Sequence, residues 1–406
     1  MTAAAPQLVA AAGDRGALAE QVLALWRQGA TAAIAVPEEQ GPLGAALPAA
    51  VDPAWGPAVV LGSGGSLGGR RWCLQPLAHL QAAAAATAAW LGQQGLDPAA
   101  TELFNPLPLA HVSGLMPLVR AQVWGVPLRW LDPALMRDPP QLLEQAQPSP
   151  GRQPLLSLVP TQLQRLVEQP EGVDWLQRFA VIWVGGAALP EALADRCRRA
   201  GLRLAPCYGS TETAAMVAAL PPQRFLEGAG GCGAPLPHAR LRLQPGGGAL
   251  EIQASSLALG TLEAGRLLPL PLQEGWWCSG DRATLGPAGL TVLGRLDGAI
   301  QSGAETVFPE QVEQRLLALA AAAQLPLAEL LLLPQPDALW GERLVALLRP
   351  RSGAAPEPLM AALSALAAQL PPSQRPRLWR HCPDLERTAA GKWQRQRWRA
   401  WLQPEP

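Results

Sequence analysis

Short apolar runs alternate with Gly-rich turns and amphipathic helical segments through the middle of the chain. The first apolar run, Ala58 to Leu61, leads into Gly62-Ser63-Gly64-Gly65-Ser66. The residues before it are rich in Ala, Gly and Pro and show only a short helical pattern near Leu18 to Trp26. Alternation of this kind indicates an α/β fold.

Two predicted loops follow successive strands. Residues 180–184 have the pattern of a buried strand that ends at Gly185-Gly186. After a helical pattern over 189–200, a second strand over 202–206 leads to the loop Tyr208-Gly209-Ser210-Thr211-Glu212. Because α/β sheets bind ligands at the carboxyl ends of their strands, we expect the two loops to lie side by side at a binding site.

The pattern changes again towards the C-terminus. Alternating residues over 239–254 flank Gly246-Gly247-Gly248 and predict a hairpin within a β-rich subdomain that reaches Gly294. Beyond it, the pattern predicts a helix at 309–319, strands at 330–333 and 344–348, and helices at 358–370 and 393–401. We therefore expect an α/β fold with a large domain over residues 1–296 and a small α+β domain over residues 298–406.

Composition narrows the classes of partner. With 406 residues, 49% hydrophobic content and a formal net charge of zero, the chain can bury a large core. This balance argues against nucleic acid or an anionic membrane as the main partner, because both need a concentrated basic patch. The basic cluster over 375–399 is better explained as a solvated face. The six Cys lack the spacing of a metal site or a disulfide framework, which predicts free thiols in a reducing compartment.

The segment from Met1 to Ala12 has no basic region before its apolar residues, unlike a secretory signal, which predicts a cytoplasmic protein. An uncharged run from Trp72 to Leu96 is long enough to span a bilayer. Its high Ala content, Pro76 and His79 favour a helix of a soluble domain without stable membrane insertion. The sequence does not decide between a monomer and a homo-oligomer.

Each Gly-rich motif, taken singly, has two interpretations. The segment from Gly62 to Gly69 could bind phosphates through backbone N–H groups, but it lacks the GxxxxGK[ST] spacing of a P-loop NTPase. Tyr208 is the only Tyr and adjoins a hydroxyl and a carboxylate, which suits base stacking, a phosphate contact and magnesium binding. The composition of Gly62 to Gly69 is also that of an ordinary surface turn. The residues Tyr208 to Glu212 would equally suit the start of a capped helix.

Lysine is the rarest charged residue in the chain. Of 32 basic side chains, 31 are Arg and one is Lys392, which follows Gly391. A Lys ammonium is a compact, mobile point charge, whereas the Arg guanidinium is a planar fork, so a site that follows a moving phosphoryl or carboxylate oxygen can require Lys. Alternatively, a composition that favours Arg could leave a single Lys at a position with no functional role.

The order of the motifs decides between these interpretations. The Ser/Gly loop and the Tyr208 to Glu212 string are followed by Trp277-Cys278-Ser279-Gly280-Asp281, Gly294-Arg295-Leu296-Asp297 and Gly391-Lys392. In this order they resemble the adenylate-forming superfamily, which includes acyl- and aryl-CoA ligases, luciferases and peptide-synthetase adenylation domains. Five motifs in sequence make a chance match negligible.

Within that superfamily the chain resembles the 2-succinylbenzoate:CoA ligases of menaquinone and phylloquinone synthesis, which are short members, as this chain is. The strings that carry this resemblance are His111-Val112-Ser113-Gly114-Leu115 with Arg120, Ser157 to Leu166, Val184-Gly185-Gly186-Ala187, and Gly233-Ala234-Pro235-Leu236-Pro237.

The resemblance implies an ATP-, Mg²⁺- and CoA-dependent reaction through an acyl-AMP intermediate. It implies that Tyr208 stacks near adenine, Thr211 touches the α-phosphate and Glu212 holds magnesium. Asp281 would bind the ribose with Arg295 nearby, and Lys392 would bridge the attacking carboxylate and the α-phosphate. The remaining nucleotide-binding residues would be Ser63, Gly64, Ser66, Gly185, Gly186, Gly209 and Ser210.

The resemblance also implies an acyl pocket and a hinge. His111 matches a histidine beside the acyl pocket, which Gly186 would share. Asp297 matches the hinge about which the small C-terminal domain turns, so the resemblance implies that this domain is mobile. The second carboxylate of 2-succinylbenzoate needs a cation or donors once it is desolvated. Arg120 and Arg165 are the candidates, although an Arg on a helix surface is the commoner case.

The chain departs from the superfamily pattern in several places. In the phosphate loop Leu67 occupies a Gly position and Arg70 a Lys position, and Gln301 stands where many relatives have Lys. The segment before this loop is short, so we expect a shortened N-terminal part. These departures leave two alternatives open, another acyl- or aryl-CoA ligase and a non-catalytic nucleotide-binding relative. A peptide-synthetase module is disfavoured because no carrier domain follows Lys392.

Overall fold

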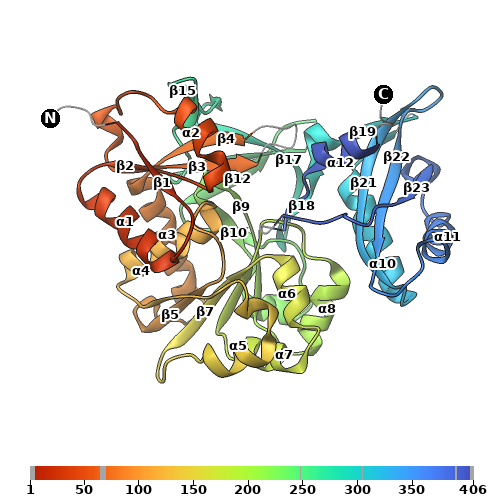
Figure 1. Cartoon of the computed structure of the whole chain (residues 1–406), viewed down its shortest axis with the longest axis horizontal. Helices are drawn as coiled ribbons and strands as arrows, with labels where there is room; N and C mark the ends of the chain where they lie inside the picture. Colours follow the sequence, from red (N-terminus) through yellow and green to blue (C-terminus); the bar gives the residue numbers. More distant parts are fainter. Residues whose placement is uncertain (1–4, 65–69, 247, 304, 389–390, 403–406) are drawn as a thin grey trace.

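The computed structural model describes residues 5–64, 70–246, 248–303, 305–388 and 391–402. Four β-sheets organise these residues (Figure 1). Three sheets and their helices form what we call the large unit, and the fourth, from Ile300 onward, forms the C-terminal unit. The predicted α/β fold class is confirmed, whereas the domain boundary near Asp297 and the mobility of the C-terminal part stay predictions.

The first sheet joins the N-terminal part to a hairpin far along the chain. Its first three strands are parallel and its last three are antiparallel. In spatial order the strands are β1 (Gln7–Ala10), β2 (Thr31–Ala35), β3 (Ala58–Gly64), β4 (Arg70–Pro76), β14 (Gly260–Glu263) and β15 (Arg266–Pro269). The helical segments here are α1 (Arg15–Arg27), η1 (Pro37–Glu39), α2 (Gln40–Ala46) and η2 (Pro53–Trp55).

Two features of this region differ from the sequence prediction. Strands β1 and β2 were not predicted, because β1 has only four residues and three of the five residues of β2 are Ala, which is a weak strand former. The uncharged run of residues 72–96 is not one helix, since it divides into the end of β4 and α3 (Leu77–Gln93). No helix of the described residues is long and apolar enough to cross a membrane.

The second sheet forms the centre of the large unit. Five of its strands are parallel, and β10 and β11 are antiparallel. In spatial order the strands are β11 (Ala234–Pro235), β10 (Ala215–Ala219), β9 (Leu204–Ser210), β8 (Val181–Val184), β7 (Gln153–Leu158), β5 (Thr101–Asn105) and β6 (Leu128–Trp130). The prediction that the strands before the two loops are neighbours is confirmed, because Ile182 pairs with Leu204.

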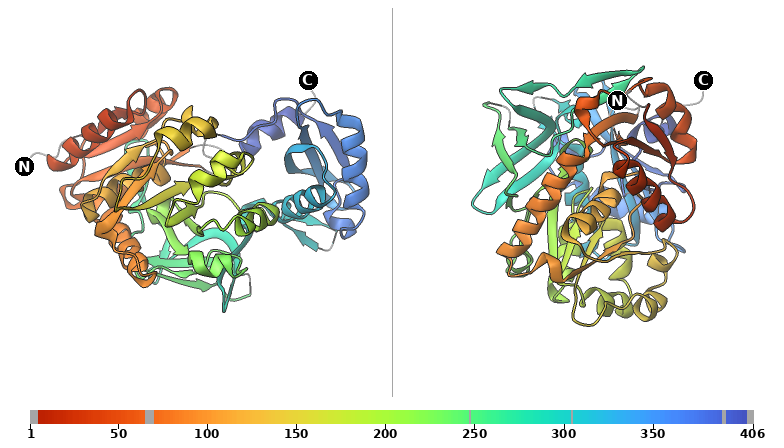
Figure 2. Two further views of the ribbon diagram at one scale, coloured as in Figure 1. Left: turned by 90° about the horizontal axis from the view of Figure 1, so that it is seen from below. Right: turned by 90° about the vertical axis from the view of Figure 1, so that its left-hand side faces the viewer.

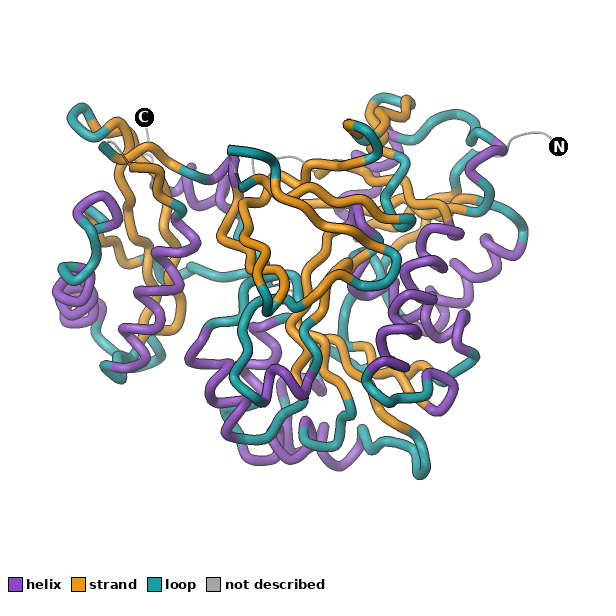
Figure 3. The backbone as a smooth tube through the Cα atoms, turned by 180° about the vertical axis from the view of Figure 1, so that it is seen from behind, coloured by secondary structure: helices purple, strands orange, loops and turns teal. Residues whose placement is uncertain are grey.

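Helices cover both faces of this sheet. α3 and α4 (Val112–Trp124) pack on one face. The other face is covered by α5 (Pro139–Gln145), α6 (Pro160–Leu166), α7 (Pro170–Leu176), α8 (Glu191–Arg199) and α9 (Pro222–Leu226). Short 3-10 turns lie at η3 (Pro98–Ala100), η4 (Leu135–Arg137) and η5 (Thr211–Thr213). Seen from behind, the strands occupy the middle of the large unit (Figure 3).

The third sheet contains the predicted β-rich segment. Its strands are β12 (Ala239–Leu243), β13 (Ala249–Ala254), β17 (Trp276–Gly286), β16 (Leu272–Gln273) and β18 (Gly289–Arg295). β12 and β13 pair antiparallel, which confirms the hairpin predicted over residues 239–254. A 3-10 turn, η6 (Leu296–Gly298), follows β18 and leads to the C-terminal unit.

The C-terminal unit has its own sheet and its own hydrophobic clusters. Its strands are β20 (Glu305–Val307), β19 (Ile300–Ser302), β22 (Gly341–Pro350), β21 (Leu327–Asp337) and β23 (Leu378–His381). Its helical segments are α10 (Pro309–Ala322), α11 (Pro356–Ala367), η7 (Pro372–Gln374) and α12 (Arg395–Leu402). The sequence predicted the helices and long strands but missed β19, β20 and β23.

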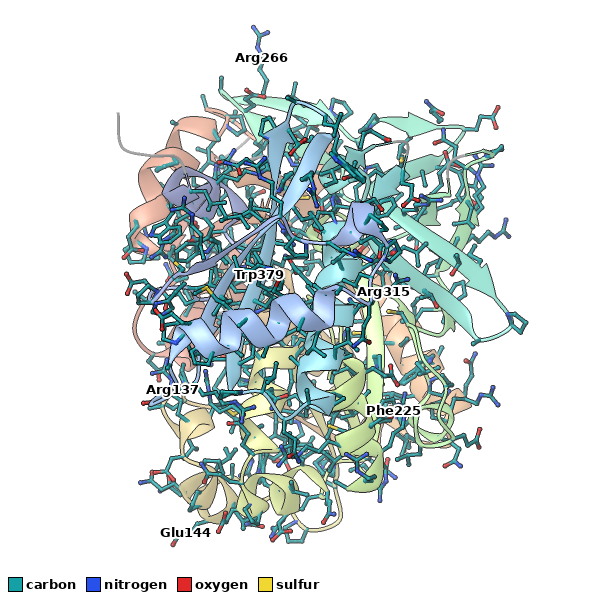
Figure 4. The ribbon with its side chains drawn as sticks, turned by 90° about the vertical axis from the view of Figure 1, so that its right-hand side faces the viewer. Arg137, Glu144, Phe225, Arg266, Arg315 and Trp379 are labelled. Carbon is teal, nitrogen blue, oxygen red and sulfur yellow. The ribbon has the colours of Figure 1, made fainter. Side chains whose placement is uncertain are left out.

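This unit lies at the end of the molecule opposite the N-terminus (Figure 2). Figure 4 views it face on, with Trp379 of β23 packed in the same cluster as Leu359 and Leu363 of α11.

Candidate active site

A glycine turn and a strand end meet at the carboxyl edge of the second sheet. Gly186, just after β8, has φ of +82°. A Cβ on Gly185 would lie 2.8 Å from Cys207 Sγ, so a larger residue there would have to move the Cys207 side chain of β9. The predicted proximity of the two motifs is therefore present in the structure.

The Tyr208 motif is not the loop that we predicted. β9 continues through Tyr208, Gly209 and Ser210 because these residues pair antiparallel with β10. A Cβ on Gly209 would lie 1.6 Å from the carbonyl oxygen of Ala215, so only glycine permits this pairing. The Gly that suggested a turn instead allows two strands to approach closely.

The turn η5 completes the motif and is strained. Thr211, Glu212 and Thr213 are all buried. Directly after them, Ala214 and Ala215 have φ of 53° and 71°, a left-handed conformation that costs about 1–2 kcal/mol per non-glycine residue. Such conformations persist where surrounding contacts enforce them, which is common at functional sites.

Three predicted nucleotide-binding residues from three strands lie together. The Tyr208 hydroxyl donates to Asp281 Oδ2 at 2.5 Å, and Arg295 Nη1 lies 3.6 Å from Asp281 Oδ1. Arg295 also donates to the Ser279 carbonyl at 2.9 Å. Burial, and then the Asp281 carboxylate, raise the pKa of Tyr208 well above its usual value. The phenol therefore stays protonated and continues to donate.

The phosphate side has buried hydroxyls without hydrogen bonds. Ser63 lies on β3, which packs beside η5. Within the described residues, Ser63 Oγ and Ser210 Oγ are buried and have no hydrogen-bond partner. Because buried polar atoms are nearly always paired, two orphaned hydroxyls here suit an oxygen-rich ligand. Gly64 ends β3.

Other parts of the predicted phosphate loop cannot be placed. Ser66 and Leu67 lie outside the described residues, and for Arg70 only its backbone position at the start of β4 is described.

Glu212 is the predicted magnesium ligand. It is buried, and Arg71 Nη2 lies 3.7 Å from its Oε1. Among the described residues no group of three or more His, Cys, Asp or Glu side chains could hold a metal ion. A single carboxylate fits magnesium that is shared with substrate phosphates, since Mg²⁺ is often bound by one or two carboxylates plus phosphate oxygens.

His111 and Arg120 belong to α4. His111 is the residue before its first turn. Gly114 lies so close to Pro108 that a Cβ would be 2.1 Å from its carbonyl oxygen, which explains the small residue three positions after His111. Asn105 Nδ2 donates to the Gly114 carbonyl at 2.7 Å and ties α4 to the end of β5.

Arg120 is not the surface residue that its charge suggests. Its side chain is 4% exposed, and its guanidinium carbon lies 4.8 Å from the centre of the Trp183 ring of β8. Burial lowers the pKa of Arg120 to about 10. Within the described part of the chain it forms no ion pair or hydrogen bond, and its Nε is a buried orphan. Arg165, the other candidate, is exposed on α6.

Lys392 comes from the C-terminal unit, in a segment that reaches the large unit (Figure 1). Its neighbour Gly391 is buried with φ of +74°, and a Cβ there would lie 3.2 Å from Thr161 Oγ1 and 3.4 Å from Val159 Cβ. Lys392 N donates to Thr388 Oγ1 at 3.1 Å. Gly391 is therefore packed against the start of α6.

Two arginines anchor the residues on either side of this segment. Arg387 pairs with Glu329 at 3.2 Å and stacks on the Trp393 ring. Arg395 pairs with Glu310 and Glu313, each at 3.2 Å.

Sequence reasoning missed several residues that contact η5. Gln75 and Ser256 hydrogen-bond to its backbone, and Arg71 pairs with Glu212. No local signal marks Gln75, which stands in an uncharged run. Arg71 could have been found from its position beside the phosphate loop.

Comparisons with known proteins show which family the chain resembles. The model of the AMP-binding enzyme family matches residues 14–251. A 2-succinylbenzoate–CoA ligase of Salmonella typhimurium is 36% identical over 211 residues, which are 51% of this chain and 41% of that protein. That of Escherichia coli is 34% identical over 245 residues, 60% of this chain and 48% of that protein. The chain spans about half the length of these curated relatives.

Solved structures have the same fold. A variant of Escherichia coli MenE with bound OSB-AMS superposes with a TM-score of 0.67 at 26% identity, covering 85% of this chain and 68% of that one. Bacillus subtilis MenE in complex with the acyl-adenylate intermediate OSB-AMP has a TM-score of 0.69 at 22% identity, covering 84% and 68%. The resemblance predicted from the motif order is confirmed. Because the family model matches more than half of its residues, the chain belongs to the AMP-binding enzyme family.

Proposed function

We propose that the chain is an ATP-dependent 2-succinylbenzoate:CoA ligase of menaquinone or phylloquinone synthesis. A substrate carboxylate oxygen attacks the α-phosphorus of ATP, the bond to the β-phosphate oxygen breaks, and acyl-AMP and pyrophosphate form. The CoA thiolate then attacks the acyl carbon, and AMP leaves. The names of the relatives support this reaction class.

The buried guanidinium of Arg120 is the observation that best supports a dicarboxylate substrate. Its guanidinium is buried and has no anionic partner among the described residues. Such a cation is costly unless a ligand supplies the opposite charge. Its contact with the Trp183 ring places it near the carboxyl end of β8, because Trp183 stands two residues before Gly185. A substrate with a second carboxylate fits this position, and we assign His111, Gly186 and the exposed Arg165 to the same acyl pocket.

The nucleotide would lie across the edge of the second and third sheets. Tyr208 would stack near adenine beside Gly185, Gly186 and Gly209. Asp281 and Arg295 would bind the ribose. Ser63, Gly64, Ser66, Ser210 and Thr211 would contact phosphate oxygens. Mg²⁺ held by Glu212 and the phosphates would neutralise charge on the leaving pyrophosphate.

Lys392 would place its ammonium between the attacking carboxylate and the α-phosphate. A preorganised cation of this kind stabilises charge that develops in the transition state, and losing such a contact costs about 10²- to 10³-fold in rate. The docking of Gly391 on α6 supports this arrangement for the first step. For the second step, we propose that residues 298–406 turn about Asp297 and withdraw Lys392.

The test is AMP formation from ATP with 2-succinylbenzoate, with and without CoA. The proposal predicts pyrophosphate release with the acid alone and AMP with 2-succinylbenzoyl-CoA when CoA is added. AMP formation only with a different acid would assign another acyl- or aryl-CoA ligase. ATP binding without AMP formation from any carboxylate would indicate the non-catalytic nucleotide-binding relative.

We also propose that the protein acts in the cytoplasm. Its six cysteines are free thiols, which is typical of a reducing compartment.

A further inference from the structure

All three backbone carbonyls of η5 accept hydrogen bonds from outside the turn. Gln75 Nε2 donates to the first, the carbonyl of Thr211, at 2.7 Å. The N–H of Ala258 donates to the second at 2.7 Å, and Ser256 Oγ donates to the third at 2.8 Å. The donors come from β4 and from the segment between β13 and β14. Two separate parts of the large unit therefore hold the turn from behind.

His238 extends this support. Its Nε2 lies 3.0 Å from Ser256 Oγ. Since the Ser256 hydroxyl proton points to the turn, its oxygen accepts here and His238 Nε2 carries the hydrogen. Burial lowers the pKa of His238 to about 4, so the ring is neutral at pH 7. The imidazole therefore directs the hydroxyl towards the Thr213 carbonyl.

The turn needs this support because of the backbone that follows it. Ala214 and Ala215 are both left-handed, a conformation that persists only when surrounding contacts enforce it. Gln75 and Ser256 are each 0% exposed, so water cannot replace their hydrogen bonds. Removing either donor leaves a buried carbonyl unpaired and a strained backbone with fewer restraints.

We propose that Gln75, Ser256 and His238 are positioning residues that keep Thr211 and Glu212 in the ATP-binding conformation. The inference rests on the proposed ATP site. A turn that is competent only part of the time binds ATP with an apparent Kd raised by the inverse of the competent fraction. Loss of one donor should therefore weaken ATP binding more than it slows the reaction at saturating ATP.

The experiment compares Ser256→Ala with Ser302→Ala. Ser302 is a matched control because it is also 0% exposed, it lies in the C-terminal unit, and its Oγ has no partner within the described residues. The readouts are the Kd of ATP by calorimetry without any acid, and hydrogen exchange of residues 208–216 in the ligand-free protein. For Ser256→Ala we expect about a tenfold higher Kd, equivalent to about 1.4 kcal/mol, and faster exchange.

The control should change neither quantity. In steady-state AMP formation, Ser256→Ala should raise the KM for ATP while kcat stays within about twofold, which separates positioning from a general structural defect. Gln75→Ala should behave in the same way. Equal Kd and exchange for the two Ser variants overturns the proposal, as does a fall in kcat with unchanged ATP affinity.

A pair of variants at His238 provides an independent arm that survives if Ser256→Ala fails to fold. His238→Leu removes the donor to Ser256 and should raise the Kd, whereas His238→Gln places an amide N–H near the Nε2 position and should restore it. Identical Kd values for these two variants contradict the role of His238. If the wild-type protein binds no ATP, the proposed function fails, and hydrogen exchange in the ligand-free protein still decides whether the turn is held.

Discussion

Replacing Arg120 by Met removes a buried cation from α4 and leaves an apolar side chain of similar length. Burial lowers the pKa of Arg120 from its ordinary 12.5 to about 10. At about 1.36 kcal/mol per pKa unit, the charged form is roughly 3 kcal/mol less favourable in the folded protein than in the unfolded chain. This cost acts in full at pH 7, because Arg is protonated in both states there.

The contact with the Trp183 ring returns part of this energy, about 1–2 kcal/mol for a desolvated cation. We therefore expect Arg120→Met to raise the free energy of unfolding of the ligand-free protein by about 1–2 kcal/mol, whereas most substitutions lower it. Urea unfolding of both proteins at pH 7 measures the difference.

The same change should weaken use of the dicarboxylate substrate. A buried carboxylate that loses its charged partner costs about 3–5 kcal/mol, which corresponds to roughly 10²- to 10⁴-fold in kcat/KM. Analogues that keep only one of the two carboxylates should be used equally by both proteins. Steady-state AMP formation gives these values, with Arg178→Met as the control because Arg178 is exposed. A destabilised variant with unchanged kcat/KM for 2-succinylbenzoate would refute the reasoning.

Four further changes test the site and its surroundings. Lys392→Ala should abolish acyl-AMP formation yet leave CoA transfer to supplied acyl-AMP largely intact, and equal loss of both half-reactions would count against a turning C-terminal unit. Gly209→Ala should lower the free energy of unfolding by about 1–3 kcal/mol or more by overpacking β9 against β10, as thermal unfolding will show. Tyr208→Phe should keep the stacking ring but raise the Kd of ATP about tenfold by removing the charged hydrogen bond to the Asp281 carboxylate; calorimetry decides. The unfolded chain takes up a proton at His238 below about pH 6.5, whereas the folded protein takes it up only near pH 4. The free energy of unfolding should therefore fall by about 3 kcal/mol as the pH decreases from 6.5 to 4, and by less in His238→Gln. Urea unfolding between pH 4 and 7 measures this difference.

Hydrophobic pattern predicted the elements that form long apolar runs or have strong periodicity. The neighbouring strands β8 and β9, the hairpin of β12 and β13, and the helices and long strands of the C-terminal unit all followed from it. Strand β2 did not, because three of its five residues are Ala, which is a weak strand former. Strands β19, β20 and β23 were missed because each is only three or four residues long.

Some residues of the candidate site could be predicted from the sequence and others could not. The order of the motifs predicted that Tyr208, Asp281 and Arg295 share one site. This was possible because the family resemblance assigns residues that are far apart in the sequence to the same nucleotide. Gly209 was taken for a turn, since its partner strand comes later in the sequence. Gln75 could not be predicted because its role depends on a tertiary contact with a backbone carbonyl. The burial of Arg120 was missed because a charged residue on a helix usually faces solvent.

The lone lysine also makes the position of the C-terminal unit measurable without a label. An endoprotease that cleaves only after lysine has a single target in all 406 residues, the bond after Lys392. A protease must draw the surrounding backbone into its cleft, which the docking of Gly391 on Val159 and Thr161 opposes. When opening is fast relative to cleavage, the rate of this one cut follows the population in which the segment has left α6. Titrating that rate with each substrate would report which of them draws the two units together.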